Sequence, residues 1–284
     1  MSHDYVITHP EARFVLVHYH LFKNGGTTLE SILEREFRDR FATLHGLDRD
    51  STLDGRHLAA FLRQHPEIAA VSSHHLRYPL PVTRHAVLFD CWFLRHPLAR
   101  IHSSYTHFRR MNSDDVLSRM ANERDSRSFV KWLVDQSPNM VSEVQVQQLA
   151  NGGVFRRPAD RDDLGRAIQT MQRMSMPGLI EMFDESLVVA EYFLRPAFPG
   201  LSLEYVARNV SDPAAQELST QDDRLRNIWG PDLFQELVRL NQLDLELHEA
   251  GAREIARRFA LIPESERRLT EFKARCSSLR ETLA

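Results

Sequence analysis

The chain has 284 residues, of which 42% are hydrophobic and 26% are charged, proportions typical of a folded globular protein with a sizeable core. Its 36 basic and 39 acidic side chains give a formal net charge of −3, which argues against a nucleic-acid-binding surface, because such surfaces are strongly basic. No apolar run approaches about 18 residues, so we expect no membrane span.

The N-terminal residues, the cysteines and the histidines indicate the cellular compartment and whether a metal site is expected. The first twelve residues, MSHDYVITHPEA, have neither a basic start nor an apolar core, so we expect no secretory signal. The two cysteines, Cys91 and Cys276, give no disulfide framework, which suits a reducing compartment. The histidines are scattered and do not recur with carboxylates at ligand spacing, so we expect no metal site. These features together predict a cytoplasmic protein.

Hydrophobic periodicity predicts strands and helices in alternation along the chain. Strands separated by helices imply parallel βαβ units with right-handed crossovers, and therefore an α/β fold with a central parallel sheet flanked by helices. The predicted strands are Phe14–His20, Ile68–Ser72, Ala86–Leu94 and Gly178–Met182, and the predicted helices are Thr27–Arg38, Gly55–His65, Pro97–Arg110, Ser128–Gln136, Val141–Ala150, Asp160–Met174, Glu185–Leu194 and Pro231–Arg258.

The C-terminal segment differs in character from the rest. Residues 263–284 read PESERRLTEFKARCSSLRETLA, which predicts a charged helix with a thin apolar seam. That seam can pack on the body of the protein or on a partner chain, so a homo-oligomer formed through this helix is one expectation. We accordingly expect one domain over residues 1–262 and a charged helical tail over 263–284. The seam consists of Leu269, Phe272, Cys276, Leu279 and Leu283.

The most informative stretch is Phe14–Leu33, FVLVHYHLFKNGGTTLESIL, which runs from an apolar strand through paired glycines into a helix. Glycines let the backbone approach a ligand, and the first helical N–H groups and the helix dipole favour an anion. Lys23 precedes the glycines, whereas the usual nucleotide-triphosphate loop has its lysine after them. The alternative is a simple Gly-Gly turn with a hydroxyl cap. The candidate anion-binding residues are Lys23, Asn24, Gly25, Gly26, Thr27 and Thr28.

A second segment, residues 85–110, reads HAVLFDCWFLRHPLARIHSSYTHFRR. The apolar run Ala86–Leu94 suits a buried parallel strand, and Pro97 takes a favourable first-turn position in the following helix. Arg95 ends the strand and Ser103 lies two turns into the helix, so both can face one anion beside the first loop. The alternative makes Arg95 a strand-end salt bridge and Ser103 a packed helix residue.

Together, the two segments resemble the PAPS-dependent sulfotransferases, most closely the carbohydrate branch that includes heparan sulfate 2-O-sulfotransferase and many bacterial relatives. That family's first motif reads approximately PKTGGTS, and here residues 22–28 read FKNGGTT. Its second reads approximately R-D-P-x-x-R-x-x-S, and here residues 95–103 read RHPLARIHS. Phe22 and His96 replace the usual proline and aspartate. The likeness continues, at lower specificity, to about Arg258.

The resemblance implies a three-layer P-loop-type fold, with residues 1–262 as a single sulfotransferase domain. It also implies roles for the donor, 3′-phosphoadenosine 5′-phosphosulfate (PAPS). The first loop would grip the 5′-phosphosulfate, and Lys23 would stabilise charge on the leaving phosphate. Arg95 and Ser103 would bind the 3′-phosphate, and Arg208, in the stretch Arg208-Asn209-Val210-Ser211, would belong to a loop that closes over the donor. No metal is implied.

Sulfuryl transfer needs a base for the acceptor hydroxyl, and histidine suits this role near neutral pH. His74 and His75 follow a predicted strand, at the edge where such sites form in α/β folds. The family has a G-H turn at this place whose histidine acts as the base. Ser73-His74 matches a small residue followed by histidine, and His75-Leu76-Arg77-Tyr78 matches the H-L-x-Y form of the same turn. We favour His74, because a small preceding residue leaves room for the acceptor, and both remain candidates.

The resemblance therefore implies a cytoplasmic transferase that moves a sulfuryl group from PAPS to a hydroxyl and releases 3′-phosphoadenosine 5′-phosphate (PAP). The acceptor would be a carbohydrate, a glycolipid or a hydroxylated natural product. Two alternatives stay open. One is a P-loop kinase or other phosphotransferase, since fold does not fix function. The other is a catalytically inactive nucleotide-binding relative.

Overall fold

The computed structural model describes residues 13–48, 51–111, 113–153, 157–206 and 218–283. The chain divides into two compact units. Unit 1 comprises Met1–Phe93, Met171–Arg208 and Ala252–Ala284, and unit 2 comprises Leu94–Thr170 and Asn209–Gly251. The helical tail over residues 263–284 therefore belongs to unit 1.

Unit 1 is built on a five-stranded sheet with the order β2-β3-β1-β4-β5. β1 pairs in parallel with β3 on one side and with β4 on the other, and β2 pairs in parallel with β3. The strand order therefore reverses at β1, and the carboxyl end of such a strand is where α/β sheets bind ligands. The strands are β1 (Arg13–Tyr19), β2 (Phe41–Thr43), β3 (Ala70–Ser73), β4 (Ala86–Leu94) and β5 (Met176–Leu179).

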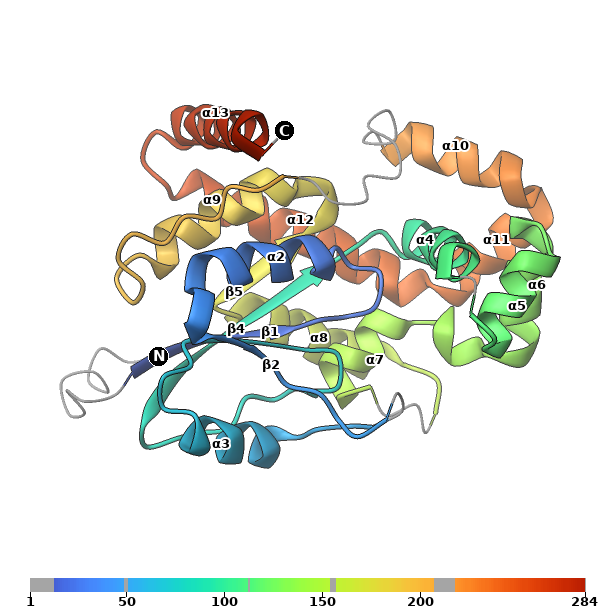
Figure 1. Ribbon diagram of the computed structural model, residues 1–284. Coiled ribbons are helices and arrows are strands. Elements are labelled where there is room, and N and C mark those ends of the chain that lie inside the picture. The colour runs from blue at the N-terminus through green and yellow to red at the C-terminus, as the bar shows by residue number, and fades with distance from the viewer. Residues whose placement is uncertain (1–12, 49–50, 112, 154–156, 207–217, 284) are drawn as a thin grey trace. The chain divides into compact units, whose positions relative to one another are not determined.

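Helices cover both faces of this sheet, as Figure 1 shows. On one face lie α2 (Gly26–Phe37), α9 (Phe183–Leu194) and α13 (Ser265–Leu283), and on the other lies α3 (Gly55–Gln64). The first face shares one apolar core, to which Leu16, Ile32, Cys91, Val189 and Phe272 belong. The structure thus confirms the expected α/β, three-layer arrangement of a central parallel sheet between helices.

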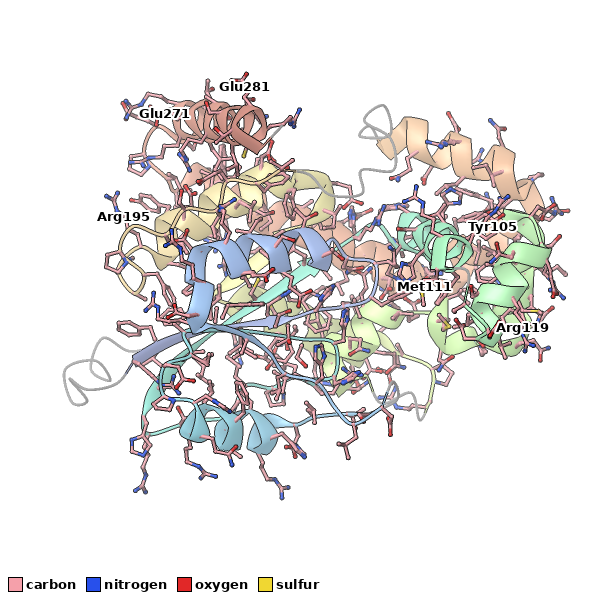
Figure 2. The ribbon with its side chains drawn as sticks, in the orientation of Figure 1. Tyr105, Met111, Arg119, Arg195, Glu271 and Glu281 are labelled. Atoms are coloured by element: carbon pink, nitrogen blue, oxygen red, sulfur yellow. The ribbon has the colours of Figure 1, made fainter. Side chains whose placement is uncertain are left out.

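Helix α13 packs on α9 through the apolar seam seen in the sequence. Leu269, Phe272 and Cys276 are buried in the core of unit 1, and Arg275 forms an ion pair of 2.7 Å with Glu191 of α9. Glu271 and Glu281 lie on the outer side of α13, away from the sheet (Figure 2). The central part of the seam is therefore occupied within the chain, and a homo-oligomer formed through this helix stays a prediction.

Unit 2 is helical in the part of the chain that the structure describes. Aromatic side chains join its helices in two ways. The rings of Tyr105 and Phe129 lie 5.5 Å apart, and the indole N–H of Trp229 donates a hydrogen bond to the Ser126 hydroxyl at 3.0 Å. Its helices include α4 (Pro97–Met111), α5 (Val116–Glu123), α6 (Ser126–Gln136), α7 (Val144–Asn151), α10 (Leu218–Trp229) and α11 (Pro231–Leu240), while α8 (Arg161–Arg173) and α12 (Gln242–Ala260) begin here and end in unit 1.

The helix predicted over Pro231–Arg258 is two helices, which meet at Asn241. The Asn241 amide donates to the carbonyls of Leu237 and Val141. The Glu143 carboxylate accepts the N–H groups of Leu243 and Asp244, which satisfies the first turn of α12. Val141 and Glu143 lie about a hundred residues from the groups that they bind at this break, so local periodicity could not reveal it. The short strand β2 and the helices α5 and α10 were also not predicted.

Candidate functional site

The loop between β1 and α2 has the backbone that an anion-binding loop needs. Lys23 and Gly25 both adopt left-handed conformations, with φ of 66° and 70°. Between them, the Asn24 amide donates to the Phe93 carbonyl of β4 at 2.8 Å, which ties the loop to the neighbouring strand. A Cβ on Gly25 would lie 2.4 Å from the Ile180 side chain. Glycine is therefore required at position 25 by its positive φ and by this contact.

The first turn of α2 suits a negative ligand. Gly25 is its N-cap and supplies no capping side chain, and no acidic residue lies in the first turn. The exposed Thr27 and half-buried Thr28 follow at the helix start. Because the N-terminal N–H groups and the helix dipole attract anions, this end of α2 can hold a phosphate or sulfate group. The candidate residues therefore lie together at the carboxyl end of β1, with Lys23, Asn24 and Gly25 in the loop and Gly26, Thr27 and Thr28 in the first turn of α2.

His74 lies beside this loop, just after β3. Its Nδ1 lies 2.9 Å from the backbone carbonyl oxygen of His20. A carbonyl oxygen can only accept, so Nδ1 carries the proton and the Nε2 of the neutral ring is left with a lone pair. Burial lowers the pKa of His74 below its ordinary value. The ring is therefore neutral at neutral pH, in a tautomer that can accept a proton at Nε2.

His75 has the opposite tautomer. Its Nδ1 accepts the backbone N–H of Gly46 at 2.6 Å, so in the neutral ring the proton sits on Nε2. Neither ring nitrogen is then ready to accept another proton, because Nδ1 is engaged and Nε2 is already a donor. Of the two histidines named by the sequence, His74 has the geometry that a general base needs.

Two further histidines, His18 and His20, line the same end of the sheet, although neither was predicted as a site residue. The rings of His18 and His20 stack at 5.1 Å, and those of His20 and His74 lie 3.7 Å apart. Burial, followed by the like charges of neighbouring histidines, lowers the pKa of His18 to about 3 and that of His20 to about 2. Both are therefore neutral at physiological pH. The available signal was their spacing of two residues, with His18 on β1 and His20 directly after it, since alternate residues of an extended segment share one face.

Arg95 and Ser103 belong to unit 2. Arg95 follows β4, and its backbone is held by the Gln145 amide, which accepts from the Arg95 N–H at 2.9 Å and donates to its carbonyl at 2.8 Å. Ser103 is buried in the second turn of α4. Gln145 was not predicted as a site residue, because its partner lies fifty residues upstream. Arg208, named with the donor site from the sequence, lies outside the described residues.

A buried pair of carboxylates fixes Gln145 in turn. Asp244 accepts the N–H groups of Gln145 and Val146 at the start of α7, while Glu143 caps α12. Burial and the neighbouring Asp244 raise the pKa of Glu143 to about 7. Asp244 thus caps α7, which begins directly after Glu143, and Glu143 caps α12, which carries Asp244. This reciprocal capping sets the position of Gln145 and, through it, the backbone of Arg95.

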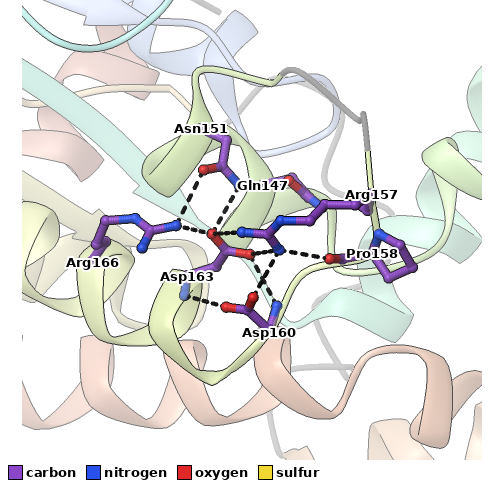
Figure 3. A network of polar contacts seen from close by, with 7 residues as sticks. All are labelled: Gln147, Asn151, Arg157, Pro158, Asp160, Asp163 and Arg166. Atoms are coloured by element: carbon purple, nitrogen blue, oxygen red, sulfur yellow. Dashed lines mark hydrogen bonds and ion pairs between the residues drawn. The ribbon is translucent and has the colours of Figure 1, made fainter.

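Polar side chains between Gln147 and Arg166 form a network of hydrogen bonds and ion pairs in unit 2, shown in Figure 3. Asp163 is completely buried, and its carboxylate pairs with Arg157 at 2.6 Å and also with Arg166. The Asn151 amide and the Asp160 N–H donate to it as well. Burial alone would raise the pKa of Asp163, but these bonds lower it to about 2. Arg157 and Arg166 are therefore engaged in ion pairs that stabilise this part of unit 2.

The chain matches no established family model. It is similar to an uncharacterized protein of the archaeon Archaeoglobus fulgidus, with 27% identity over 244 residues that cover 84% of this chain and 95% of the relative. Within the described residues, no helix is long and apolar enough to cross a membrane. Nor do His, Cys, Asp and Glu side chains gather there in a group that could hold a metal ion.

Proposed function

We propose that the protein is a sulfotransferase that moves a sulfuryl group from PAPS to a hydroxyl of an acceptor and releases PAP. The observation that carries this proposal is the placement of His74 beside the Lys23–Gly26 loop, with its Nδ1–H fixed on the His20 carbonyl. A proton acceptor next to an anion-binding loop is what in-line transfer to a hydroxyl requires.

The loop residues fit the 5′-phosphosulfate end of the donor. Left-handed Gly25 and the uncapped first turn of α2 present backbone N–H groups to an anion. The Thr27 and Thr28 hydroxyls can donate to its oxygens. The bound donor supplies the activated sulfuryl group, and the chain supplies its orientation. Asn24 fixes the loop on β4 through the Phe93 carbonyl.

Lys23 provides the cation near the leaving phosphate oxygen. Its backbone is held at a φ of 66°, a conformation that is uncommon outside glycine and is often found at functional sites. A preorganised ammonium group lowers the barrier most where negative charge develops during the reaction. Lys23 would therefore act on the leaving group, and its loss would reduce turnover more than folding.

His74 acts at the other end of the transfer. With Nδ1–H on the His20 carbonyl, Nε2 would take the proton of the acceptor hydroxyl as the new oxygen–sulfur bond forms. The lowered pKa of His74, caused first by burial, keeps this nitrogen unprotonated at neutral pH. His75 would instead position the Gly46 loop through its Nδ1.

Arg95 and Ser103 would hold the 3′-phosphate, which distinguishes PAPS from ATP-like nucleotides. Arginine suits a phosphate dianion because its guanidinium can donate two parallel hydrogen bonds. The double hydrogen bond between the Arg95 backbone and Gln145 supports this assignment, because a fixed backbone limits where the side chain can reach. The resemblance to the sulfotransferases assigns Arg208 to the same donor site.

The test combines binding and turnover. Calorimetry should detect PAP binding in the presence of a metal chelator, and added Mg²⁺ should leave the affinity unchanged. Radiolabelled PAPS, incubated with a library of sugars, glycolipids and phenolic acceptors, should then give a labelled product together with PAP. A Mg²⁺ requirement together with ATP turnover would instead identify a phosphotransferase, and PAP binding without any turnover would point to an inactive relative.

A further inference from the structure

His20 lies between the anion-binding loop and the candidate base and contacts both. Its backbone carbonyl accepts the Nδ1–H of His74 at 2.9 Å, and the two imidazole rings lie 3.7 Å apart at an interplanar angle of 30°. On its other side the ring stacks on His18. The residue is only 7% exposed. His20 therefore has little freedom to move without moving His74.

The same ring fills the space beside Gly26, the first residue of α2. A Cβ at Gly26 would lie 1.9 Å from Cδ2 and 2.0 Å from Nε2 of His20. These distances are far shorter than any real contact, so the ring of His20 occupies the place of a side chain at position 26. Because His18 and His74 flank the ring, it cannot rotate aside to accommodate a methyl group.

We infer that His20 is a positioning residue that links the Gly25–Gly26 loop to His74, so that the backbone of the donor loop and the orientation of the base are set together. This inference rests on the proposed role of His74 as the base. It assigns to His20 no contact with donor or acceptor. It explains why glycine is needed at position 26, although the φ there is an ordinary helical one.

The charges that face His20 are consistent with a neutral positioning role. Glu30 of α2 lies 3.6 Å from its Nδ1, and His18, His74, Lys23 and His45 face it from β1 and the surrounding loops. Burial and the like charges of the histidines and Lys23 lower the pKa of His20 to about 2 and keep the ring neutral despite the nearby Glu30. The ring therefore contacts His74 through its aromatic face rather than as a charge. A neutral aromatic ring of similar size should therefore preserve the contact.

The first test uses Gly26→Ala, whose added methyl group collides with His20. We expect this variant to weaken PAP binding by about tenfold or more, through displacement of the ring and the loop. The double variant Gly26→Ala/His20→Ala removes the collision and should restore PAP affinity to within about threefold of wild type. Gly26→Ala/His20→Phe keeps the collision and should not. Gly165→Ala in α8 is the matched control, because a Cβ there meets nothing within 4 Å.

The second test reads the tautomer of His74 directly in the unliganded protein. Proton–nitrogen correlation spectra of ¹⁵N-histidine-labelled protein should show the Nδ1–H form for His74, with the His74→Gln variant identifying its signals. His20→Ala should give a mixture of tautomers, because the carbonyl remains but the stacking ring is lost. His20→Phe should restore the single form.

An unchanged His74 tautomer in His20→Ala would overturn the inference, and so would wild-type PAP affinity in the Gly26→Ala variant. The proposed function is tested separately. If the wild-type protein binds no PAP and transfers no sulfuryl group, the tautomer measurements on unliganded protein still decide whether His20 positions His74. Circular dichroism and thermal unfolding of each variant confirm that the fold is intact before these comparisons are made.

Discussion

The Nδ1 atom of His75 accepts the backbone N–H of Gly46 at 2.6 Å, so the imidazole of His75 holds the loop that follows β2. The neighbouring His74 uses its Nδ1 as a donor to the His20 carbonyl. Two adjacent histidines thus have opposite tautomers, because one meets a backbone donor and the other a backbone acceptor. Only His74 keeps an unprotonated Nε2.

This difference predicts different outcomes for the two alanine variants. His74→Ala should lower sulfuryl transfer by about 10²–10⁴, the usual effect of removing a general base. PAP affinity should stay near wild type, because the base acts on the acceptor. His75→Ala should cost much less turnover. Radiometric transfer assays paired with PAP calorimetry measure both quantities. Loss of transfer in His75→Ala with an active His74→Ala would assign the base to His75.

Lys23→Ala tests the leaving-group role. The protein should fold normally, because position 23 lies in a partly exposed loop. Turnover should fall by about 10² or more, because charge stabilisation in the transition state is lost. Single-turnover rates measured with saturating PAPS isolate this effect from donor binding. A rate within about threefold of wild type would refute the assigned role.

Arg95→Ala tests nucleotide selection. Because the arginine is assigned to the 3′-phosphate alone, PAP should bind less tightly by about 1.5–3 kcal/mol, or one to two decades in affinity. Adenosine 5′-phosphosulfate, which lacks that phosphate, should bind the variant and the wild type similarly. Calorimetric titration with both nucleotides makes the comparison. Equal weakening of both would show that Arg95 has a structural role instead.

The lowered pKa of Asp163 predicts that this residue stabilises the fold less in acid. Its folded-state pKa of about 2 lies below the ordinary value, so its stabilisation is present above about pH 4 and is lost as the pH falls towards 2. Asp163→Asn should lower the free energy of unfolding at pH 7 by about 1.5–3 kcal/mol, through loss of charged hydrogen bonds. Urea unfolding at pH 7 and pH 3 should show a smaller difference between the proteins at the lower pH. An undiminished difference at pH 3 would show that the effect does not come from the ionised carboxylate.

The raised pKa of Glu143 predicts the opposite dependence of stability on pH. Its folded-state pKa of about 7 lies above the ordinary value, so its contribution to stability is greatest at about pH 4 and decreases as the pH rises through 7. Glu143→Gln should remove this slope, because an amide does not titrate. Urea unfolding of both proteins at pH 5, 6 and 7 measures it. Identical slopes would mean that Glu143 ionises in the folded state with an ordinary pKa.

The sequence predicted the structure best where interactions between neighbouring residues decide the local conformation. The strand β1, the turn through Gly25 and Gly26 and the start of α2 follow from an apolar run, paired glycines and helical periodicity, and the structure has them within a residue or two of the predicted bounds. The strand β4 and the helix after Pro97 followed in the same way. Alternation of strands and helices was enough to predict a parallel sheet between helical layers.

The features that local periodicity did not predict depend on contacts between residues far apart in the sequence. The break at Asn241 is caused by Glu143 and Val141, and the role of Gln145 depends on Arg95. The three-residue strand β2 exists only as an edge of the sheet beside β3. In each case a polar group or a backbone edge finds its partner far along the chain, and nothing in the neighbouring residues reveals that partner.

The sequence by itself thus determined the fold class, the turn from β1 into α2 and the set of candidate site residues, because residue type and spacing decide which groups a strand, a turn or a helix start can present. Only the tertiary structure decided how the histidines differ. His74 meets the carbonyl of His20 and His75 meets the N–H of Gly46. The proton of a neutral imidazole goes to the nitrogen that faces an acceptor, and that choice depends on neighbours brought together by folding.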